Sequence, residues 1–358
     1  MNLIEKTVKS IETLNENRME EAQARLNNLS KPRGSLGKLE DIAIQLAGIT
    51  GKLYPVIENK YHMVMAGDHG VADEGVSAFP RDVTTGMVYN FLQGGAAINV
   101  LADQAGAQLK IVDIGVKNKI NPDFIKENLQ DNVFIERKIK AGTDNMARGP
   151  AMTGKEAVAC IETGIDLTLD LIDSGADIIG TGEMGIANTT PSSAIVAAVV
   201  DIPLLELVGY GTGIDEEKRK HKKEVIARAL TINQPDPEDG IDILTKVGGL
   251  EIGGMAGIML GAASRRVPVV IDGLISAAAA LIAYKIEPKV KEYFIASHSS
   301  VEPGHEKIYE YLGLTPMLNM NMRLGEGTGA VLAFNLVESA CKIIANMATF
   351  DDLAKLDF

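Results

Sequence analysis

Six short apolar runs recur through the middle of the chain, separated mostly by Ala-rich stretches with helical spacing. The runs cover residues 62–70, 109–116, 133–139, 176–183, 267–273 and 293–300. Strands that are apolar on both faces and alternate with helices form a parallel sheet with helices on both sides. The pattern therefore predicts an α/β fold built on a doubly wound, parallel sheet.

Both ends of the chain have a helical pattern instead. Residues 1–30 are polar and Glu-rich, which predicts one or two helices, and a Pro/Gly turn then leads into a helix from about Lys38. The last segment, residues 330–353, again has helical spacing, so we expect it to pair with the N-terminal helices in a small helical subdomain. Residues 204–208 fit either a strand or a helix.

The ends of the predicted strands gather polar residues at one edge of the sheet. In open α/β sheets, ligands bind beyond the carboxyl ends of the strands. That edge holds Asp68, His69, Asp113, Gly115, Gly182, Glu183, Asp272, Gly273, Ser297, His298 and Ser299. Two glycine-rich loops, residues 209–215 and 325–330, precede predicted helices and can present backbone N–H groups to an anion.

The sequence GTGEMG at residues 180–185 has the G-x-G-x-x-G spacing of a dinucleotide-binding turn. In that turn the third glycine lies in the helix, whereas Pro191 here predicts a helix over 192–200 and leaves Glu183 in an extended loop. This mismatch argues against an NAD-dependent oxidoreductase, which stays an alternative together with a catalytically silent nucleotide-binding protein.

Glu183 and Glu326 differ from the other acids because glycines flank both of them. Each carboxylate is expected to protrude from a turn, where partial burial raises its pKa toward that of a useful base. The alternative is a pair of solvated loop acids. His69, beside Asp68, fits a general base or, as we favour, a hydrogen-bonded residue of the rim.

The chain of 358 residues is long enough for about two domains, and 46% hydrophobic residues supply a large core. Its formal charge of -13 disfavours binding to nucleic acid or to an anionic membrane surface. The basic cluster at residues 218–223 is typical of a solvated helix face. The pattern contains no signal peptide and no membrane span, so we expect a cytoplasmic protein.

Two features that resemble metal or thiol sites have simpler interpretations. Residues 149–155 nearly form a Walker A loop, but Glu156 occupies the position of the magnesium-binding Ser or Thr, so we interpret the segment as a helix entrance. Cys160 and Cys341 lack metal-ligand spacing and are expected to be core residues. The histidines show no paired ligand spacing either, so no metal site is expected.

Seven segments together resemble one family. They are residues 31–40, 66–80, 180–194, 211–215, 248–257, 272–281 and 323–330, in the order in which that family carries them. Over essentially its whole length the chain is similar to the nicotinate-nucleotide–dimethylbenzimidazole phosphoribosyltransferases of cobalamin nucleotide-loop assembly. The resemblance implies a Rossmann-like, mainly parallel six-stranded sheet in a catalytic domain of residues 59–330. It also implies a small helical domain of residues 1–58 plus 331–358, and a homodimer in which a partner loop helps to close the active site.

The resemblance further implies a reaction, the transfer of 5-phosphoribose from nicotinate mononucleotide to 5,6-dimethylbenzimidazole or a related base. The products are α-ribazole 5'-phosphate and nicotinate, with inversion at the anomeric carbon and without a cofactor or metal. Glu326 matches the catalytic base of the family and Glu183 its second essential acid. The matched substrate residues are Ser77 and Leu324 for the benzimidazole, and Gly185, Lys222, Asp272 and Gly273 for the ribose and phosphate. Tyr210 departs from the family, which carries an arginine at that position.

Overall fold

One parallel sheet of six strands organises the chain. A computed structural model describes residues 2–128, 133–200 and 202–355. Its strands are β1 (Lys60–Gly67), β2 (Ala107–Gly115), β3 (Phe134–Glu136), β4 (Ile178–Met184), β5 (Val269–Ile271) and β6 (Phe294–Ala296). Their order is β3-β2-β1-β4-β5-β6 and each neighbouring pair is parallel. The predicted doubly wound, Rossmann-like sheet is confirmed, and each predicted apolar run contains one strand.

Helices and short 3-10 turns connect the strands. The helices are α1 (Leu3–Lys9), α2 (Glu16–Asn28), α3 (Lys38–Thr50), α4 (Val83–Leu92), α5 (Ala97–Ala105), α6 (Pro122–Asn128), α7 (Gly154–Asp173), α8 (Thr189–Val199), α9 (Leu204–Leu207), α10 (Glu216–Asn233), α11 (Gly240–Val247), α12 (Leu250–Ser264), α13 (Leu274–Ile286), α14 (Pro303–Leu312), α15 (Thr328–Asn346) and α16 (Phe350–Leu353). The 3-10 turns are η1 (Gly70–Glu74) and η2 (Pro288–Tyr293). Residues 204–208, for which the sequence allowed two interpretations, begin as the short helix α9.

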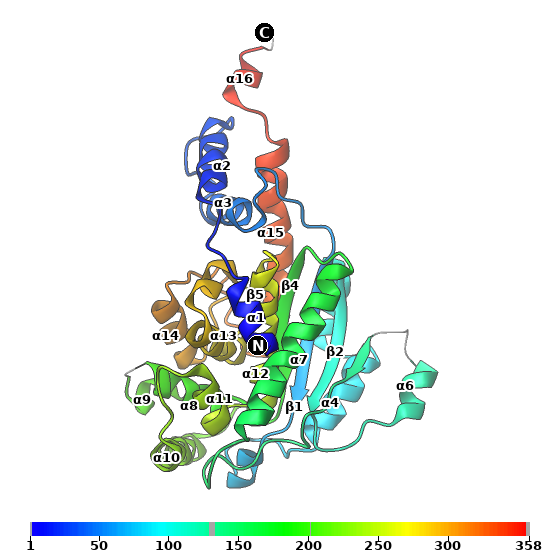
Figure 1. Ribbon diagram of the computed structural model, residues 1–358, viewed down its shortest axis with the longest axis vertical. Helices are drawn as coiled ribbons and strands as arrows, with labels where there is room; N and C mark the ends of the chain where they lie inside the picture. Colours follow the sequence, from blue (N-terminus) through cyan, green and yellow to red (C-terminus); the bar gives the residue numbers. More distant parts are fainter. Residues whose placement is uncertain (1, 129–132, 201, 356–358) are drawn as a thin grey trace.

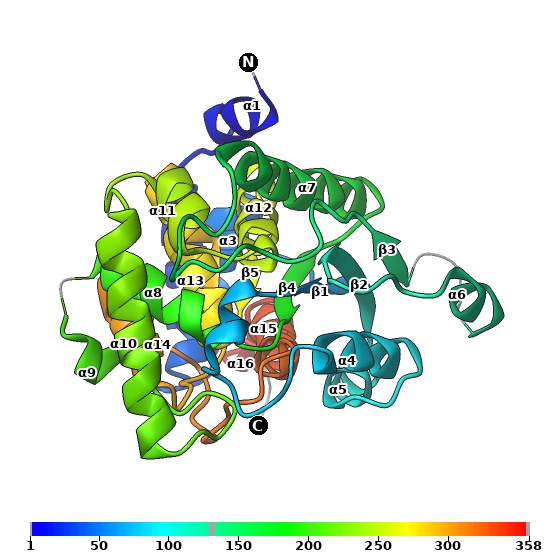
Figure 2. The ribbon, with the colours of Figure 1, turned by 90° about the horizontal axis from the view of Figure 1, so that it is seen from below.

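The core forms two layers, one on each face of the sheet. Successive side chains of a strand point to opposite faces, so Met63 and Met65 of β1 join one cluster, and Val64 and Ala66 join the other. Helices α7, α12 and α13 cover the first face, and α4, α5 and α15 cover the second (Figure 2). This double cover explains why the strands are apolar on both faces.

Helices α2, α3 and α15 pack together at one end of the molecule (Figure 1). Helix α1 lies elsewhere, because it packs against α7 and α12. The division into residues 1–58 plus 331–358 and residues 59–330 therefore stays a prediction, and residues 1 and 356–358 of it lie outside the described part of the chain.

Among the described helices, α15 is long and apolar enough to cross a membrane, but it is largely buried here as a core helix.

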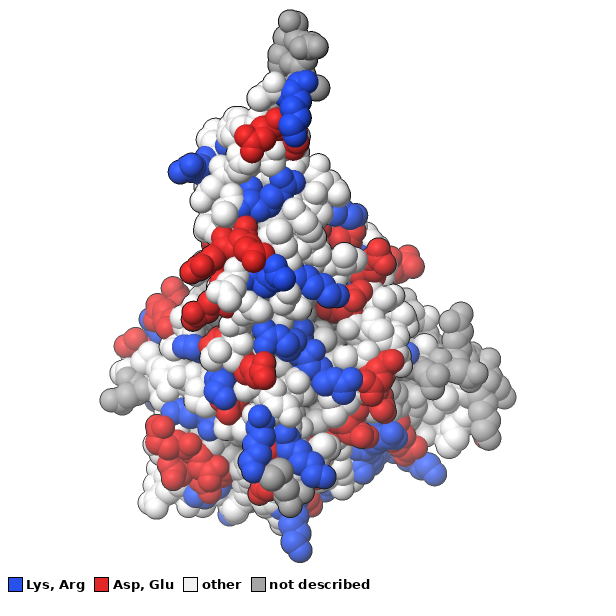
Figure 3. Space-filling view, turned by 45° about the horizontal axis from the view of Figure 1, so that its top comes forward, with Lys and Arg blue, Asp and Glu red and all other residues white. Residues whose placement is uncertain are grey.

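Charged side chains of both signs are interspersed over the face of the molecule shown in Figure 3. Several pair across elements that are distant in sequence. Lys60, at the start of β1, lies 2.8 Å from Glu338 of α15. This pair connects α15 to the sheet.

Two helix starts refine the sequence interpretation. Residues 149–155 do lead into a helix, since Thr153 and Glu156 form a capping box at the start of α7. Helix α8, however, begins at Thr189 and not at Ser192 as predicted. Pro191 is tolerated at the third position of the helix, because backbone N–H groups of the first turn have no helical partner in any case.

The crossing of α7 over α12 depends on glycine. A methyl group on Gly164 of α7 would overlap the carbonyl of Gly254 in α12, and one on Gly257 would overlap the carbonyl of Ile161. The two backbones are therefore in direct contact, which only glycine permits.

We predict that Gly164→Ala lowers the free energy of unfolding by about 1–3 kcal/mol, because the added methyl forces the two helices apart. Gly86→Ala is the matched control: Gly86 is exposed in α4 with open space around it, so alanine there should be neutral or stabilise by about 0.5–1 kcal/mol. Chemical denaturation of both variants measures the difference. Equal stability of the two variants would contradict the close crossing.

Candidate active site

A cavity of about 490 Å³ opens beyond the carboxyl ends of β4, β5 and β6, where the sequence analysis placed the ligand site. This volume is in the range of small-molecule sites. Part of its wall is apolar and consists of Phe79, Val83, Met87, Ile186, Leu274, Ile275 and Leu324. The rest is polar and includes Glu183, Asn188, Thr189, Thr212, Asp272, Ser276, His298, Ser300, Glu302, Arg323 and Glu326. The cavity lining thus combines apolar side chains with hydrogen-bonding and charged groups.

Six of the eight residues singled out from the sequence line this cavity, namely Glu183, Gly185, Asp272, Gly273, Leu324 and Glu326. Ser77 and Lys222 are not in the described lining. The Ser77 hydroxyl lies 3.3 Å from the hydroxyl of Thr212, so Ser77 stands directly behind a lining residue. Lys222 likewise donates a hydrogen bond to a lining residue, Thr189.

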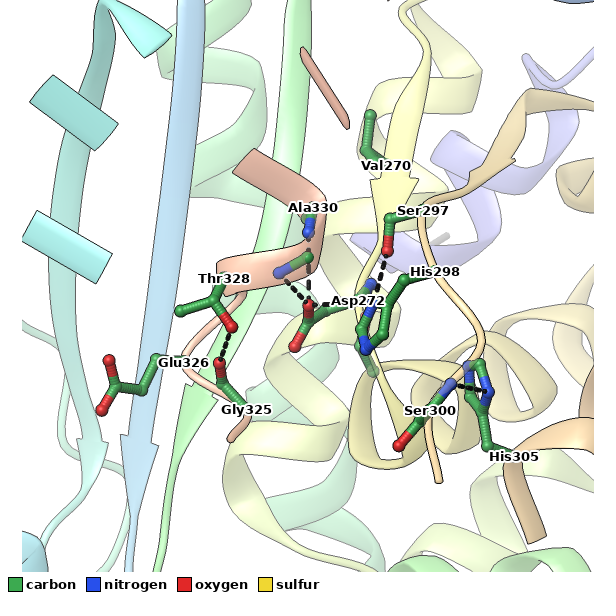
Figure 4. A network of polar contacts seen from close by, with 12 residues as sticks. Val270, Asp272, Ser297, His298, Ser300, His305, Gly325, Glu326, Thr328 and Ala330 are labelled. Carbon is green, nitrogen blue, oxygen red and sulfur yellow. Dashed lines mark hydrogen bonds and ion pairs between the residues drawn. The ribbon is translucent and has the colours of Figure 1, made fainter. Parts of the chain in front are cut away.

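Asp272, just after β5, connects helix α15 to the sheet. Its Oδ1 accepts hydrogen bonds from the N–H groups of Gly329 (2.8 Å) and Ala330 (3.2 Å) in the first turn of α15. Figure 4 shows this carboxylate between that turn and His298, whose Nδ1 lies 3.7 Å away. Burial raises the pKa of Asp272, and the imidazole and the N–H groups oppose that rise.

Glu326 lies in the loop that this contact fixes. Gly325, Glu326 and Gly327 all have positive φ values, 89°, 62° and 85°. One carboxylate oxygen of Glu326 accepts a hydrogen bond from the N–H of Ile98 (3.2 Å) in the first turn of α5. Burial raises the pKa of Glu326, and the Ile98 N–H lowers it. This direction agrees with the expectation, but Glu326 is 6% exposed and does not protrude uncovered.

Glu183 is the second-last residue of β4, so the prediction of an extended loop around it is wrong. The strand runs further than expected because its glycines are covered by the 325–327 loop and by β1. Asn188 donates a hydrogen bond to the Glu183 carboxylate. Burial, with the charges of Asp272 and Glu251, raises the pKa of Glu183 to about 8. Both glutamates therefore have the character of bases in a desolvated site.

Lys222 turns inward from α10, whose other basic residues are at least partly exposed. It is 1% exposed, and its Nζ donates a hydrogen bond to Thr189 Oγ1 at 2.6 Å. Burial lowers the pKa of Lys222 to about 8, and the charge of Glu302 opposes this. The glycine-rich loop before α10 is held beside it, since the Gly211 N–H donates to Glu302 at 2.9 Å.

Several lining residues were missed by the sequence analysis. Arg323 donates to the carbonyl of Gly211 at 3.3 Å, and its place beside Leu324 in the 323–330 segment was the available signal. Glu302 gave no local signal, because its partner lies 91 positions away. Tyr210, the departure from the family, bonds through its hydroxyl to Glu216 (3.0 Å) and stands outside this cavity among the described residues.

His69 is buried beneath Gly185, and its Nε2 lies 2.8 Å from Glu251. That arrangement agrees with the favoured interpretation of a hydrogen-bonded residue of the rim.

Cys160 and Cys341 are free and buried, as expected for core residues. Within residues 2–128, 133–200 and 202–355, no group of three or more His, Cys, Asp or Glu side chains is arranged to hold a metal ion.

Comparisons with known proteins agree with this geometry. A family model described as a phosphoribosyltransferase matches residues 11–354. The nicotinate-nucleotide–dimethylbenzimidazole phosphoribosyltransferase of Desulforamulus reducens is 53% identical over 98% of this chain and 98% of its own. The enzyme of the same name from Geobacter sulfurreducens is 50% identical over 98% of both chains. The crystal structure of CobT from Thermus thermophilus has a TM-score of 0.89 at 39% identity and covers 96% of this chain and 100% of that one.

The raised pKa of Glu183 predicts a specific dependence of stability on pH. Between its ordinary value of 4.5 and about 8, the unfolded chain releases a proton that the folded protein keeps, so the folded state loses stability as pH rises. Glu183→Gln removes this titration. The free energy of unfolding of the variant should therefore rise relative to that of the wild type from about pH 5 to pH 8. Above pH 8 the difference between the two free energies should be constant.

Glu338→Gln is the matched control. Hydrogen bonds from Lys342 and Lys60 lower the pKa of Glu338, so its difference from wild type should change only below about pH 4.5. Urea denaturation at several pH values measures both differences. A pH-independent difference for Glu183→Gln would contradict the raised pKa.

Proposed function

Since the chain belongs to the phosphoribosyltransferase family of these relatives, we propose that it transfers 5-phosphoribose from nicotinate mononucleotide to 5,6-dimethylbenzimidazole or a related base. The products are α-ribazole 5'-phosphate and nicotinate. The relatives carry this activity in their names, and the family match argues against an NAD-dependent oxidoreductase. The observation that supports the proposal best is that two buried carboxylates, those of Glu183 and Glu326, line the same cavity.

The cavity offers groups suited to both substrates. Phe79, Val83, Met87 and Leu324 offer an apolar surface for a flat aromatic base beside Glu326. Gly185, Gly211, Thr212 and Gly273 of the same lining offer backbone and hydroxyl groups for a ribose phosphate. The buried ammonium group of Lys222, hydrogen-bonded to the lining residue Thr189, supplies positive charge for the phosphate.

The chemistry requires a base and a means of stabilising positive charge. Nicotinate leaves as a neutral amine from a pyridinium, and attack from the opposite face inverts the β configuration to α. Benzimidazole loses its N–H proton as its other nitrogen bonds to the anomeric carbon, and the Glu326 carboxylate accepts that proton. Glu183, when ionised, stabilises the positive charge that develops on the sugar.

A product assay tests the proposal directly. The purified protein is incubated with nicotinate mononucleotide and a panel of bases that includes 5,6-dimethylbenzimidazole, adenine and a phenol, and the products are separated by chromatography and identified by NMR. We expect equal amounts of nicotinate and a 5'-phosphorylated α-nucleoside. Binding of nicotinate mononucleotide without turnover of any base would instead indicate a silent homologue.

We predict that Glu326→Gln lowers kcat about 10²-fold or more while the affinity for nicotinate mononucleotide changes little, because the variant loses only the proton acceptor. Glu306→Gln, an exposed acid on α14, is the control and should keep normal turnover. Steady-state kinetics and calorimetric binding measure the two effects. Near-normal turnover of Glu326→Gln would show that another group is the base.

We further propose a cytoplasmic homodimer in which a loop of the partner covers the cavity. Phe79 and Leu324 support this, because they line the cavity yet are 52% and 59% exposed in the single chain. Free, buried Cys160 and Cys341 suit a reducing compartment.

Sedimentation velocity should give a dimer at micromolar concentration, because apolar lining residues that are half exposed need a cover. Activity measured over the same dilution series should fall as the dimer dissociates. A fully active monomer would contradict a partner contribution to the site.

A further inference from the structure

His62 of β1 contacts the catalytic loop and is not among the described residues that line the cavity. It is fully buried, and its Nε2 lies 2.9 Å from the carbonyl oxygen of Glu326. A carbonyl only accepts hydrogen bonds, so Nε2 must carry the hydrogen. The other ring nitrogen, Nδ1, is buried without a hydrogen-bond partner among the described residues. Burial lowers the pKa of His62 to about 4, so the ring is neutral.

Three glycines make room for this ring. A Cβ on Gly180 would lie 2.6 Å from His62 Nδ1, and one on Gly182 would lie 2.5 Å from Nε2. A Cβ on Gly327 would also overlap the imidazole. Gly180 and Gly182 are the first two glycines of the dinucleotide-like spacing in β4. Their role here is to admit a side chain from the neighbouring strand.

The backbone of Glu326 needs such support. Its φ of 62° lies in the left-handed region, which disfavours a residue with a Cβ, and the surrounding structure must hold it there. The His62 hydrogen bond acts on the carbonyl of that same residue. On the other side of the loop, Asp272 holds the N–H groups of Gly329 and Ala330. The loop is therefore fixed from both sides.

We propose that His62 is a positioning residue for the catalytic base: its Nε2–H fixes the left-handed backbone of Glu326 and so aims the carboxylate at the N–H of the bound benzimidazole. The inference rests on the proposed function. A displacement of about 1 Å in a catalytic group can cost two orders of magnitude in rate, so loss of this bond acts on kcat.

Two substitutions at this position separate the hydrogen bond from packing. His62→Met has a similar length and no donor, whereas His62→Gln keeps an N–H donor. We expect His62→Met to lower kcat with 5,6-dimethylbenzimidazole about 10- to 100-fold with little change in KM for nicotinate mononucleotide, and His62→Gln to restore most of that loss. A 1-alkylated benzimidazole has no proton to lose, so its turnover should be much less sensitive to His62→Met.

The outcomes distinguish a failure of the proposed function from a failure of the positioning role of His62. If wild type forms no nucleoside product, or if Glu326→Gln keeps its turnover, the proposed function or its base is wrong, whatever His62 does. If Glu326→Gln is impaired but His62→Met keeps its kcat, the positioning role is overturned. The positioning role is also overturned if His62→Met lowers kcat equally with 5,6-dimethylbenzimidazole and with the 1-alkylated benzimidazole, or if His62→Gln does not restore kcat. Either result would show that His62 acts only through packing.

A second measurement needs no active variant. In protein labelled with ¹⁵N-histidine, the His62 signal, assigned through its loss in His62→Gln, should show the neutral Nε2–H tautomer from pH 5 to pH 8. A scalar coupling across the hydrogen bond to the carbonyl carbon of Glu326 should accompany it. The Nδ1–H tautomer, or titration of the ring within that range, would overturn the proposal.

Discussion

The hydrogen bonds from the first turn of α15 to the Asp272 carboxylate are the constraint on which the site depends. They join a segment near the end of the chain to the end of β5, the strand beside the edge strand β6. The loop that carries Glu326 enters α15 at that turn, so its position over the sheet edge follows from this contact (Figure 4). The same loop covers Glu183, because a Cβ on Gly325 would overlap the Glu183 carboxylate. The hydrogen bonds between Asp272 and α15 therefore contribute to the burial of both glutamates.

Burial has an electrostatic consequence that the individual contacts do not show. Glu183, Asp272 and Glu326 share one desolvated region, and the charge of Asp272 raises the pKa of each glutamate. Such a cluster is costly for folding, because each ionised carboxylate loses hydration. In return, the protein holds carboxylates whose pKa values are raised, which strengthens them as proton acceptors once they are ionised. The amide of Asn188 and the N–H of Ile98 limit the rise without removing it.

Much of the sheet was predictable from the sequence, because the strands are buried on both faces and their apolar runs are interrupted by clear turn residues. The edge that holds the site followed from the same reasoning, as did the inward turn of Lys222 once the family resemblance was recognised. Contacts between distant segments were not predictable. Nothing local indicates that Glu302 faces Gly211, and the start of α8 was misplaced because proline is allowed at several positions of a first turn.

The glycines of residues 180–185 illustrate the limit of motif reasoning. Their spacing is that of a dinucleotide-binding turn, yet Gly180 and Gly182 lie within β4 and make room for His62 of the neighbouring strand. The register of β1 against β4 pairs His62 with Gly180, and the carbonyl of Glu326 also approaches Gly182. The cause of the pattern is steric and comes from a neighbouring strand and from the loop that carries Glu326.

The central claim is that the folded chain buries two glutamates and thereby raises the pKa of each. Titration of protein labelled with ¹³C at the glutamate carboxyl carbons tests it most directly, with Glu183 and Glu326 assigned through their Gln variants. The account predicts that Glu183 titrates near pH 8 and that Glu326 titrates above the ordinary value of 4.5. If both carboxyl groups titrate near 4.5, the account of the site is contradicted.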